Sequence, residues 1–430
     1  MDQATRNQQT LSQKGVAIIA VLAALAILGG AVAEFSTDTA VDGVSATNAR
    51  DDMQTHFLAR SGANLTQLII KLQTDVVDKY REQLGDFQIA DYAGMFMGAF
   101  GGGREEVDAM AEMLGGFKGD AIKGLGVAVG NFDVVITTDD GRINMNCANG
   151  TQQSQETLKA QLEALFYFEA FDPIFESEDA EGWRRDRATQ ASALIDYIDR
   201  DRAGFGQPGT QEEYGYETLD DRYRAKNNYI DTVSELKLVR GIDDRMWTLF
   251  GDQFTAYGEC KVNLGAVQDP KLIASILFLS AKNADDPVVK DPIKLWALAS
   301  YVIQARSLGI YFDDLQAFAD FVKDPQGSVG TLFASEQAAG TAPQQPPAAT
   351  VNGVAVEGLE LDATKLGQVA RSGPRRIYRV EVVATVPRGV EGTGNDYVKR
   401  LVAVWDTKTQ NQNSRDPSAA QGAWVYWREE

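Results

Sequence analysis

The chain has 430 residues, enough for two or three domains, and 44% of them are hydrophobic, so it can bury a substantial core. Its 61 acidic residues outnumber its 41 lysines and arginines, and the resulting net charge of −20 disfavours nucleic acid and anionic lipid as partners. A single histidine, His56, argues against a histidine-based metal site or catalytic triad.

The first element along the chain is an uncharged apolar stretch, Gly15–Ala33. At about 1.5 Å of rise per residue it predicts a helix of roughly 28 Å, close to the thickness of a bilayer's hydrocarbon core. Arg6 and Lys14 precede it, and Glu34 and Asp38 follow it, so the positive-inside rule places the rest of the chain outside the cytoplasm. A cleaved signal peptide, a simple signal anchor and a buried core helix are the alternatives, and the lack of a polar face argues against the last.

The residues immediately before this stretch are Gln13, Lys14, Gly15 and Val16. A short polar leader ending in Lys-Gly before an apolar helix resembles a prepilin-type (class III) signal. The resemblance implies that a prepilin peptidase cleaves after Gly15 and that Val16 becomes the N-methylated first residue. Ala20 stands where most such proteins have glutamate. The family that dispenses with this glutamate is the K-type minor pseudopilin of type II secretion systems.

The next elements are a continued helix and a strand pair. Phe35–Thr74 predicts a helix with an apolar stripe, and residues 75–130 have no clear pattern and are interpreted as a helical insert without a phosphate loop. Phe132–Cys147 predicts a β-hairpin that turns at Asp139–Arg142, and its sequence resembles the first sheet hairpin of K-type pseudopilins. The stripe consists of Phe57, Leu58, Leu65, Leu68, Ile69 and Leu72.

Two helices are predicted at Leu158–Phe175 and Arg184–Asp199, followed by a loop rich in glycine and acidic residues. Carboxylates in a flexible loop supply the oxygen ligands that calcium prefers, although the spacing of an EF-hand is absent. The segment also resembles the region in which K-type pseudopilins hold calcium, so calcium is the implied cofactor. A solvated acidic loop without an ion is the alternative. The candidate ligands are Asp199, Asp201 and Glu213, followed by Asp220 and Asp221.

Thr232–Ile242 predicts a short helix that is capped by Ser234 and ends at Gly241. It resembles half of a helix-hairpin-helix, a DNA-binding module, but no basic stripe flanks it, so nucleic acid is not expected as a partner. With the downstream segment that begins at Cys260, it resembles K-type pseudopilins. Cys147 and Cys260 are expected to form a disulfide in an extracytoplasmic domain, and two buried thiols are the alternative.

The remaining chain predicts helices at Pro270–Ser280 and within Leu295–Val322, a proline-rich linker at Thr341–Ala349, and three strands near the C-terminus. We therefore expect an α+β fold: a long N-terminal hydrophobic α-helix of the pilin type packed on an antiparallel sheet, with a large inserted helical domain. The expected parts are the leader 1–15, the pilin helix 16–74, the helical insert and first hairpin 75–150, the inserted domain 151–330, the linker 331–370, and the strands 371–430, which begin at Arg376, Tyr397 and Ala423.

No catalytic pattern is present: there is no Gly-x-Ser-x-Gly, no histidine near a nucleophile and no zinc-ligand spacing. The sequence therefore predicts a protein that is not an enzyme. The resemblance implies a structural minor pseudopilin at the tip of the type II secretion pseudopilus, which helps to initiate assembly and to export folded proteins across the outer membrane. It implies a single-pass protein of the bacterial inner membrane with its head in the periplasm. The implied partners are other minor pseudopilins, the prepilin peptidase and the inner-membrane assembly platform. The alternatives are a minor pilin of a type IV pilus and a signal-anchored periplasmic protein without a filament role.

Overall fold

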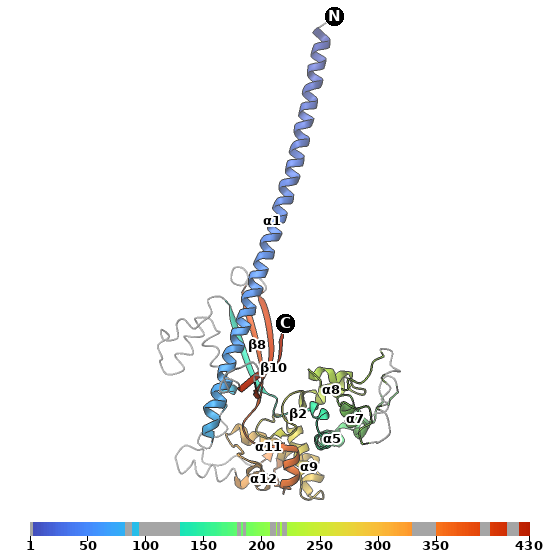
Figure 1. Cartoon of the computed structure of the whole chain (residues 1–430), viewed down its shortest axis with the longest axis vertical. Coiled ribbons are helices and arrows are strands. Elements are labelled where there is room, and N and C mark those ends of the chain that lie inside the picture. Colours follow the sequence, from blue (N-terminus) through green and yellow to red (C-terminus); the bar gives the residue numbers. More distant parts are fainter. Residues whose placement is uncertain are drawn as a thin grey trace, which may run out of the picture. The chain divides into compact units, whose positions relative to one another are not determined.

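The protein is described by a computed structural model (Figure 1). Its internal contacts divide the chain into two units, of which the first contains Met1–Gly62, Ala99–Asp133 and Val383–Arg400, and the second contains Ala63–Gly98, Val134–Val382 and Leu401–Glu430. The structure describes residues 3–81, 88–93, 130–178, 182–183, 186–206, 212, 216, 222–328, 350–387, 396–410 and 421–430.

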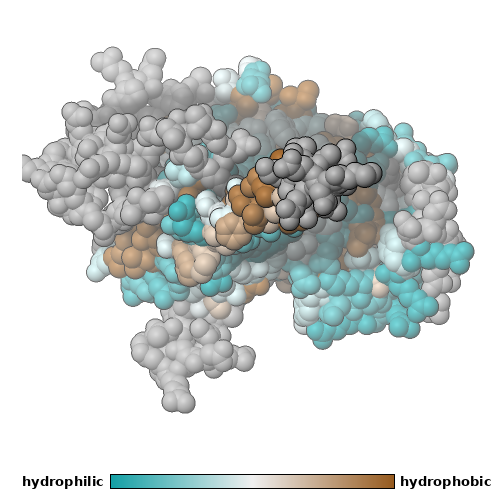
Figure 2. Space-filling view, turned by 90° about the horizontal axis from the view of Figure 1, so that it is seen from above, coloured by the Kyte–Doolittle hydropathy of each residue, from teal (hydrophilic) through white to brown (hydrophobic). Residues whose placement is uncertain are grey.

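Helix α1 (Gln3–Asp75) is one continuous helix that contains the apolar stretch (Figure 1). Every side chain described from Gly15 to Arg50 is exposed, and the helix is long and apolar enough to cross a membrane. Two hydroxyl groups after the apolar stretch bond back to the helix itself: Thr37 and Thr39 donate to the carbonyls of Ala33 and Phe35 at 2.9 and 2.7 Å. Figure 2, seen from above relative to Figure 1, shows hydrophobic surface beside the grey atoms at the centre of the view. This part of α1 is therefore a candidate membrane anchor.

Beyond Arg50, α1 buries one face and leaves another apolar face exposed. The predicted stripe is wrong in part: Leu58 is buried, but Phe57 and Leu68 are 59% and 62% exposed. The buried face instead passes through small residues such as Ala59 and Ala63, both 0% exposed, which allow close approach of the helix to its neighbours. The buried residues between 55 and 73 are Thr55, Leu58, Ala59, Gly62, Ala63, Thr66, Ile70 and Gln73.

Contacts in the first unit join α1 to the sheet. Asp52 accepts hydrogen bonds from the hydroxyl of Tyr397 at 2.7 Å and from the ammonium group of Lys399 at 2.8 Å. Gly130 has a φ of 89°, and a Cβ at this position would lie 2.6 Å from the carbonyl oxygen of Thr385 and 2.8 Å from Leu58. Only glycine fits this close approach with this backbone conformation.

The main sheet has four strands in the order β1-β8-β9-β10, with β1 at Asn131–Thr138, β8 at Ile377–Val386, β9 at Tyr397–Gln410 and β10 at Gln421–Glu429. Side chains alternate between buried and less buried positions along β1 and β8, as expected when one face of a sheet covers a core. Strand β10 pairs with β9 antiparallel, with Trp424 opposite Trp405. The three predicted C-terminal strands thus form, and the fold is α+β with a long N-terminal apolar helix.

The predicted hairpin at Phe132–Cys147 is wrong. Its first strand forms as β1, but the returning strand is only β2 (Ile143–Asn144), which pairs parallel with β3 (Phe254–Thr255) rather than with β1. The chain then turns into η4 (Met145–Asn149), because the Asn144 side chain accepts a hydrogen bond from the backbone of Asn146 and caps that helix. The strand beside β1 is β8, which follows more than two hundred residues later.

The turn after β1 is held by buried ion pairs within the second unit. Asp139 is 0% exposed and accepts two hydrogen bonds from the guanidinium group of Arg379, at 3.1 and 2.6 Å. Asp140 accepts from Arg371 at 2.8 Å and from the backbone N–H of Arg376. Each buried carboxylate therefore has a cation or a backbone donor, as removal from water requires.

The chain between β1 and β8 forms a mainly helical domain. The Pro270–Ser280 helix is confirmed, and Leu295–Val322 contains two helices. The Leu158–Phe175 helix is interrupted after Phe166, and the Arg184–Asp199 helix is shorter than predicted. Before β1 the described chain contains η1 (Val77–Tyr80) and η2 (Ile89–Tyr92). The further elements between β1 and β8 are α5 (Gln152–Phe166), η5 (Glu169–Phe171), α6 (Asp172–Phe175), α7 (Arg187–Asp196), η7 (Val233–Leu238), α8 (Asp244–Phe250), η8 (Gly251–Gln253), β4 (Val262–Asn263), α9 (Pro270–Ser280), α10 (Pro287–Lys290), α11 (Pro292–Ser307), α12 (Leu315–Lys323), β5 (Thr350–Val351), β6 (Val354–Ala355), α14 (Ala363–Val369) and β7 (Ala370–Arg371).

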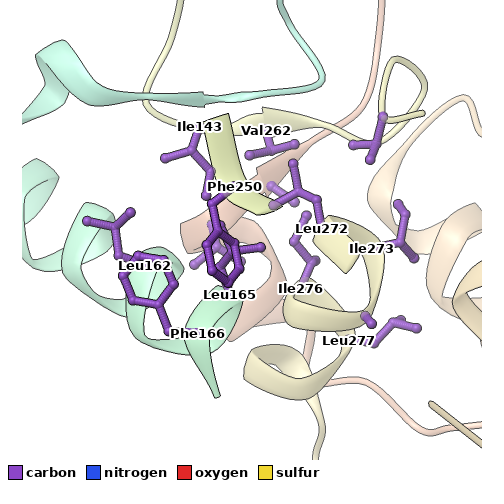
Figure 3. Packing of buried hydrophobic residues seen from close by; sticks show 14 of the residues in the cluster. Ile143, Leu162, Leu165, Phe166, Phe250, Val262, Leu272, Ile273, Ile276 and Leu277 are labelled. Carbon is purple, nitrogen blue, oxygen red and sulfur yellow. The ribbon is translucent and has the colours of Figure 1, made fainter. Parts of the chain in front are cut away.

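Helices α5 and α9 meet in the core of this domain (Figure 3). Leu162, Leu165 and Phe166 of α5 are fully buried, and Phe250 packs edge-on against Phe166 with ring centroids 5.0 Å apart. On the facing side, α9 contributes Leu272, Ile273, Ile276 and Leu277, which are at most 1% exposed. This core fixes the position of α7, which packs on α5.

Most of these helices have an aspartate side chain as their N-terminal cap. Asp269, Asp286 and Asp291 each accept hydrogen bonds from the first turn of a helix whose first residue is proline. In η7 the cap is Thr232, with Glu235 completing a capping box, so the prediction of Ser234 as the cap is wrong. A share of the chain's acidic residues therefore has a structural role.

The predicted linker 331–370 is wrong over its second half. Residues 350–371 form β5, β6, α14 and β7, and α14 packs on α9. Leu366 and Ala370 are 0% exposed, and β7 pairs with β4. The proline-rich residues Thr341–Ala349 lie outside the described residues.

Candidate metal centre

Three carboxylates meet at the C-terminal end of α7. Oxygen atoms of Asp199, Asp201 and Glu212 all lie within 4.8 Å of one another. Helix α7 begins where Asp186 accepts a hydrogen bond from Thr189, and after Tyr197 the chain makes a tight turn in which the Asp199 N–H donates to the carbonyl of Ile195 at 2.9 Å. The turn therefore directs Asp199 into the fold, where it is 2% exposed.

The loop after α7 is attached to the helix end by Asn227. This residue adopts a left-handed conformation with a φ of 46°, and its N–H donates to the carbonyl of Tyr197 at 3.0 Å. Its side-chain amide donates to the carbonyl of Asp201 and, at 3.2 Å, to the carboxylate of Glu212. One asparagine thus holds two members of the cluster, although they come from separate parts of the loop.

Crowding changes the acidity of these groups. Burial, reinforced by the charges of Asp201, Asp196 and Glu212, raises the pKa of Asp199 to about 8. Burial also raises the pKa of Glu212 to about 7, because the hydrogen bond from Asn227 only partly offsets it and the charges of Asp196 and Asp201 add to it. A divalent cation would remove this repulsion.

The cluster also contains acceptors that no described residue satisfies. Oδ1 of Asp199 and Oε1 of Glu212 are buried and have no hydrogen-bond partner among the residues that the structure describes. Asp201 holds its own loop through a hydrogen bond from the N–H of Ala203 at 2.8 Å. Buried carboxylate oxygens without donors are the atoms expected around a hard cation such as calcium, so the residues present fit such an ion.

The predicted ligands are brought together only in part. Asp199 and Asp201 lie in one cluster, whereas Glu213, Asp220 and Asp221 lie outside the described residues. Glu212, next to Glu213 in sequence, was not predicted. Two adjacent glutamates in a loop are equivalent by composition, and nothing in the sequence pattern singles out Glu212.

The predicted processing site is freely accessible. Gly15 and Val16 lie on α1, and both are exposed. A Cβ added at Gly15 would meet no atom within 4 Å, so glycine is not required there by the packing of the chain itself.

The two cysteines are joined. Cys147 in η4 and Cys260 form a disulfide with a Cα–Cα distance of 5.6 Å across a sequence separation of 113 residues. Cys147 is 4% exposed. The bond links the turn after β2 to the segment that leads into β4.

The middle of the chain is similar to a known protein family. Residues 141–256 match the family model described as type II secretion system (T2SS), protein K. The matched range contains Cys147, α7 and the acidic cluster, and it confirms the resemblance to K-type pseudopilins for this segment. The sequence has no match among curated proteins.

A solved structure is also similar to the chain. It is the crystal structure of the GspK-GspI-GspJ complex from the enterotoxigenic Escherichia coli type 2 secretion system. The similarity has a sequence identity of 13%, covers 71% of this chain and 81% of that chain, and has a TM-score of 0.42.

Proposed function

We propose that the chain is a structural minor pseudopilin of a type II secretion machinery. The match of residues 141–256 to protein K of that system carries the proposal. The apolar half of α1 supports it, since its exposed side chains suit a lipid environment and its length suits a single membrane crossing. With basic residues before and acidic residues after the apolar stretch, the head lies in the periplasm.

Processing after Gly15 is the step that distinguishes a pseudopilin from a simple signal-anchored protein. The prepilin peptidase removes residues 1–15, and Val16 becomes the N-methylated first residue. The intact mass of the protein purified from membranes tests this step. A mass corresponding to a methylated chain from Val16 supports the proposal, whereas an uncut chain or cleavage after Ala33 contradicts it.

The partners in this proposal are other minor pseudopilins. Outside the apolar stretch, α1 exposes Met53, Phe57 and Leu68 to solvent at 60%, 59% and 62%. Exposed apolar side chains along one helix are expected to pack against the helices of sister subunits. Disulfide crosslinking from a cysteine at position 57 to sister pseudopilins tests this contact, with a cysteine at the exposed Glu156 as the control.

The proposed position is the tip of the pseudopilus. A pilin subunit uses its glutamate to neutralise the terminal amine of the subunit already in place, since an unpaired charge in lipid is costly. Ala20 offers no carboxylate, so this chain is suited to enter first and to have no subunit above it. Electron microscopy of overexpressed pseudopili with a labelled head tests the position. Label along the whole shaft would contradict it.

We also propose that Asp199, Asp201 and Glu212 hold a calcium ion. The two buried oxygens without a donor support this assignment. When bound, calcium supplies the positive charge that these carboxylates lack in the folded chain. The chain's own residues do the rest: the turn after α7 buries Asp199, and Asn227 positions the loop that carries Asp201 and Glu212.

A further inference from the structure

Two residues of η4 connect this short helix to different parts of the chain. Cys147 is bonded to Cys260, and two residues later Asn149 reaches the end of α7. The turn is compact and well packed, since Met145 and Ala148 are 0% exposed. Only the buried residue Ala148 separates Cys147 from Asn149, so a shift of the disulfide would also shift Asn149.

Asn149 contacts the backbone that presents the carboxylate cluster. Its side-chain Nδ2 donates to the carbonyl of Ile198 at 2.6 Å, and Ile198 immediately precedes Asp199. Its other polar atom, Oδ1, is buried and has no hydrogen-bond partner among the described residues. With Oδ1 of Asp199 and Oε1 of Glu212, it is the third such acceptor oxygen in this region. Asn149 therefore contacts the backbone next to Asp199 and has an acceptor that no described residue satisfies.

A second connection runs through Gln155 of α5. Its Nε2 donates to the carbonyl of Ala148 at 2.8 Å and lies 3.5 Å from Oδ2 of Asp199. The turn is thus tied to the cluster both through the backbone of Ile198 and through the side chain of Asp199. Both ties start within two residues of Cys147.

We propose that Asn149 is a positioning residue of the calcium site and that the Cys147–Cys260 disulfide sets the affinity of this site by holding Asn149 in place. The inference rests on the proposed calcium site. Asn149 holds the Ile198 carbonyl in place and thereby positions the adjoining residue, Asp199, which would hold the ion. Without the disulfide, the turn must be ordered when the ion binds, which costs binding free energy. Residues that orient metal ligands typically change metal affinity by about 10–100-fold.

Calcium titration of the full-length protein in detergent, followed by calorimetry, tests the proposal. Asn149→Ala should weaken the calcium Kd by about tenfold or more, and so should Cys147→Ala combined with Cys260→Ala. Asn263→Ala is the matched control, because Asn263 is buried and, like Asn149, its side-chain amide donates to a distant carbonyl, that of Gly373 at 3.0 Å. Its Kd should stay within threefold of the wild-type value.

Combining the changes separates positioning from general loosening of the fold. If the disulfide acts through Asn149, then adding Asn149→Ala to the cysteine variant should weaken binding by less than threefold more. Independent, multiplicative losses would overturn the proposal, as would wild-type affinity in both variants. Circular dichroism establishes that each variant is folded at the titration temperature, and Gln155→Ala, which cuts the second connection, provides a further variant with an expected loss in the same direction.

The outcomes also separate this inference from the proposals on which it rests. If the wild-type protein binds no calcium, the calcium site and the role of Asn149 are both refuted. The pseudopilin assignment is then still decided by the mass of the processed chain. If the wild-type protein binds calcium and the variants bind equally well, only the role of the disulfide-held turn is refuted.

Discussion

Calcium binding at the cluster should release protons. Burial raises the pKa of Asp199 to about 8 and that of Glu212 to about 7, so at pH 7 the first carboxyl is mostly protonated and the second is about half protonated. Calcium binds the ionised forms, so about one to two protons should leave per ion. The affinity should consequently rise between pH 6 and pH 8. Calorimetry in buffers of different ionisation enthalpy measures both quantities.

The raised pKa values also determine how the stability of the ion-free fold changes with pH. A carboxyl whose folded-state pKa is raised destabilises the ion-free fold increasingly as the pH rises from its unfolded value towards its folded value. For Asp199 this interval begins at 3.8 and ends near 8. At about 1.4 kcal/mol per unit, the penalty at pH 7 is at most about 4 kcal/mol. Calcium at about 100 times its Kd should restore about 2.7 kcal/mol and raise the Tm by roughly 5–10 °C.

Asp199→Asn should raise the stability of the ion-free protein but reduce its stabilisation by calcium. The variant should unfold at a higher temperature than the wild-type protein in chelator at pH 7, because a buried ionisable group is gone. It should lose most of the Tm increase with calcium, and magnesium should have little effect on either protein. Asp252→Asn, at an exposed position outside the cluster, is the control. An equal calcium response in both variants would refute the reasoning and indicate general screening of the negative surface.

Three further outcomes are expected. Gly15→Val should leave the leader on the chain by intact mass without changing the fold, since the added side chain has free space; a protein of mature length would contradict the processing site. Replacing Cys147 and Cys260 by alanine should lower the free energy of unfolding in urea by up to about 4–5 kcal/mol, and an unchanged midpoint would contradict a structural role. Asp139→Ala should cost about 3–5 kcal/mol, because the guanidinium group of Arg379 loses its carboxylate; a loss below about 1 kcal/mol would show that the pair is screened by water.

Parts of the fold follow from local sequence alone. The apolar stretch from Gly15 has a length set by a bilayer, and the strands at Ile377 and Tyr397 have β-branched and aromatic residues in alternation. Helix α9 begins with Asp269 and Pro270, a cap and first residue that can be recognised without tertiary information. These features depend on residues that are close together in the chain.

The features that the sequence did not predict depend on contacts between residues far apart in the chain. The pairing of β1 with β8 depends on contacts between residues more than two hundred positions apart, such as the donation from the Asp139 N–H to the carbonyl of Ile377 at 3.2 Å. The residues around Gly141 correctly predict a turn. They do not indicate that the strand after this turn, β2, pairs with β3 and not with β1. Likewise, Glu212 enters the cluster because Asn227 binds it across the loop, which no periodicity records.

The inserted helical domain begins and ends at two residues that are hydrogen-bonded to each other, Asp139 and Ile377. The chain leaves the sheet at Thr138 and returns at Ile377, and the Thr138 hydroxyl donates to the Ile377 carbonyl at 2.9 Å. In the sheet, β1 and β8 are therefore adjacent strands whose connecting turn has been replaced by a whole domain. Because both ends of the inserted chain meet at one point, insertions or deletions within the domain need not shift the register of the strands. A two- to five-residue turn in its place would give an ordinary hairpin, so the size of the domain can change independently of the sheet that carries it.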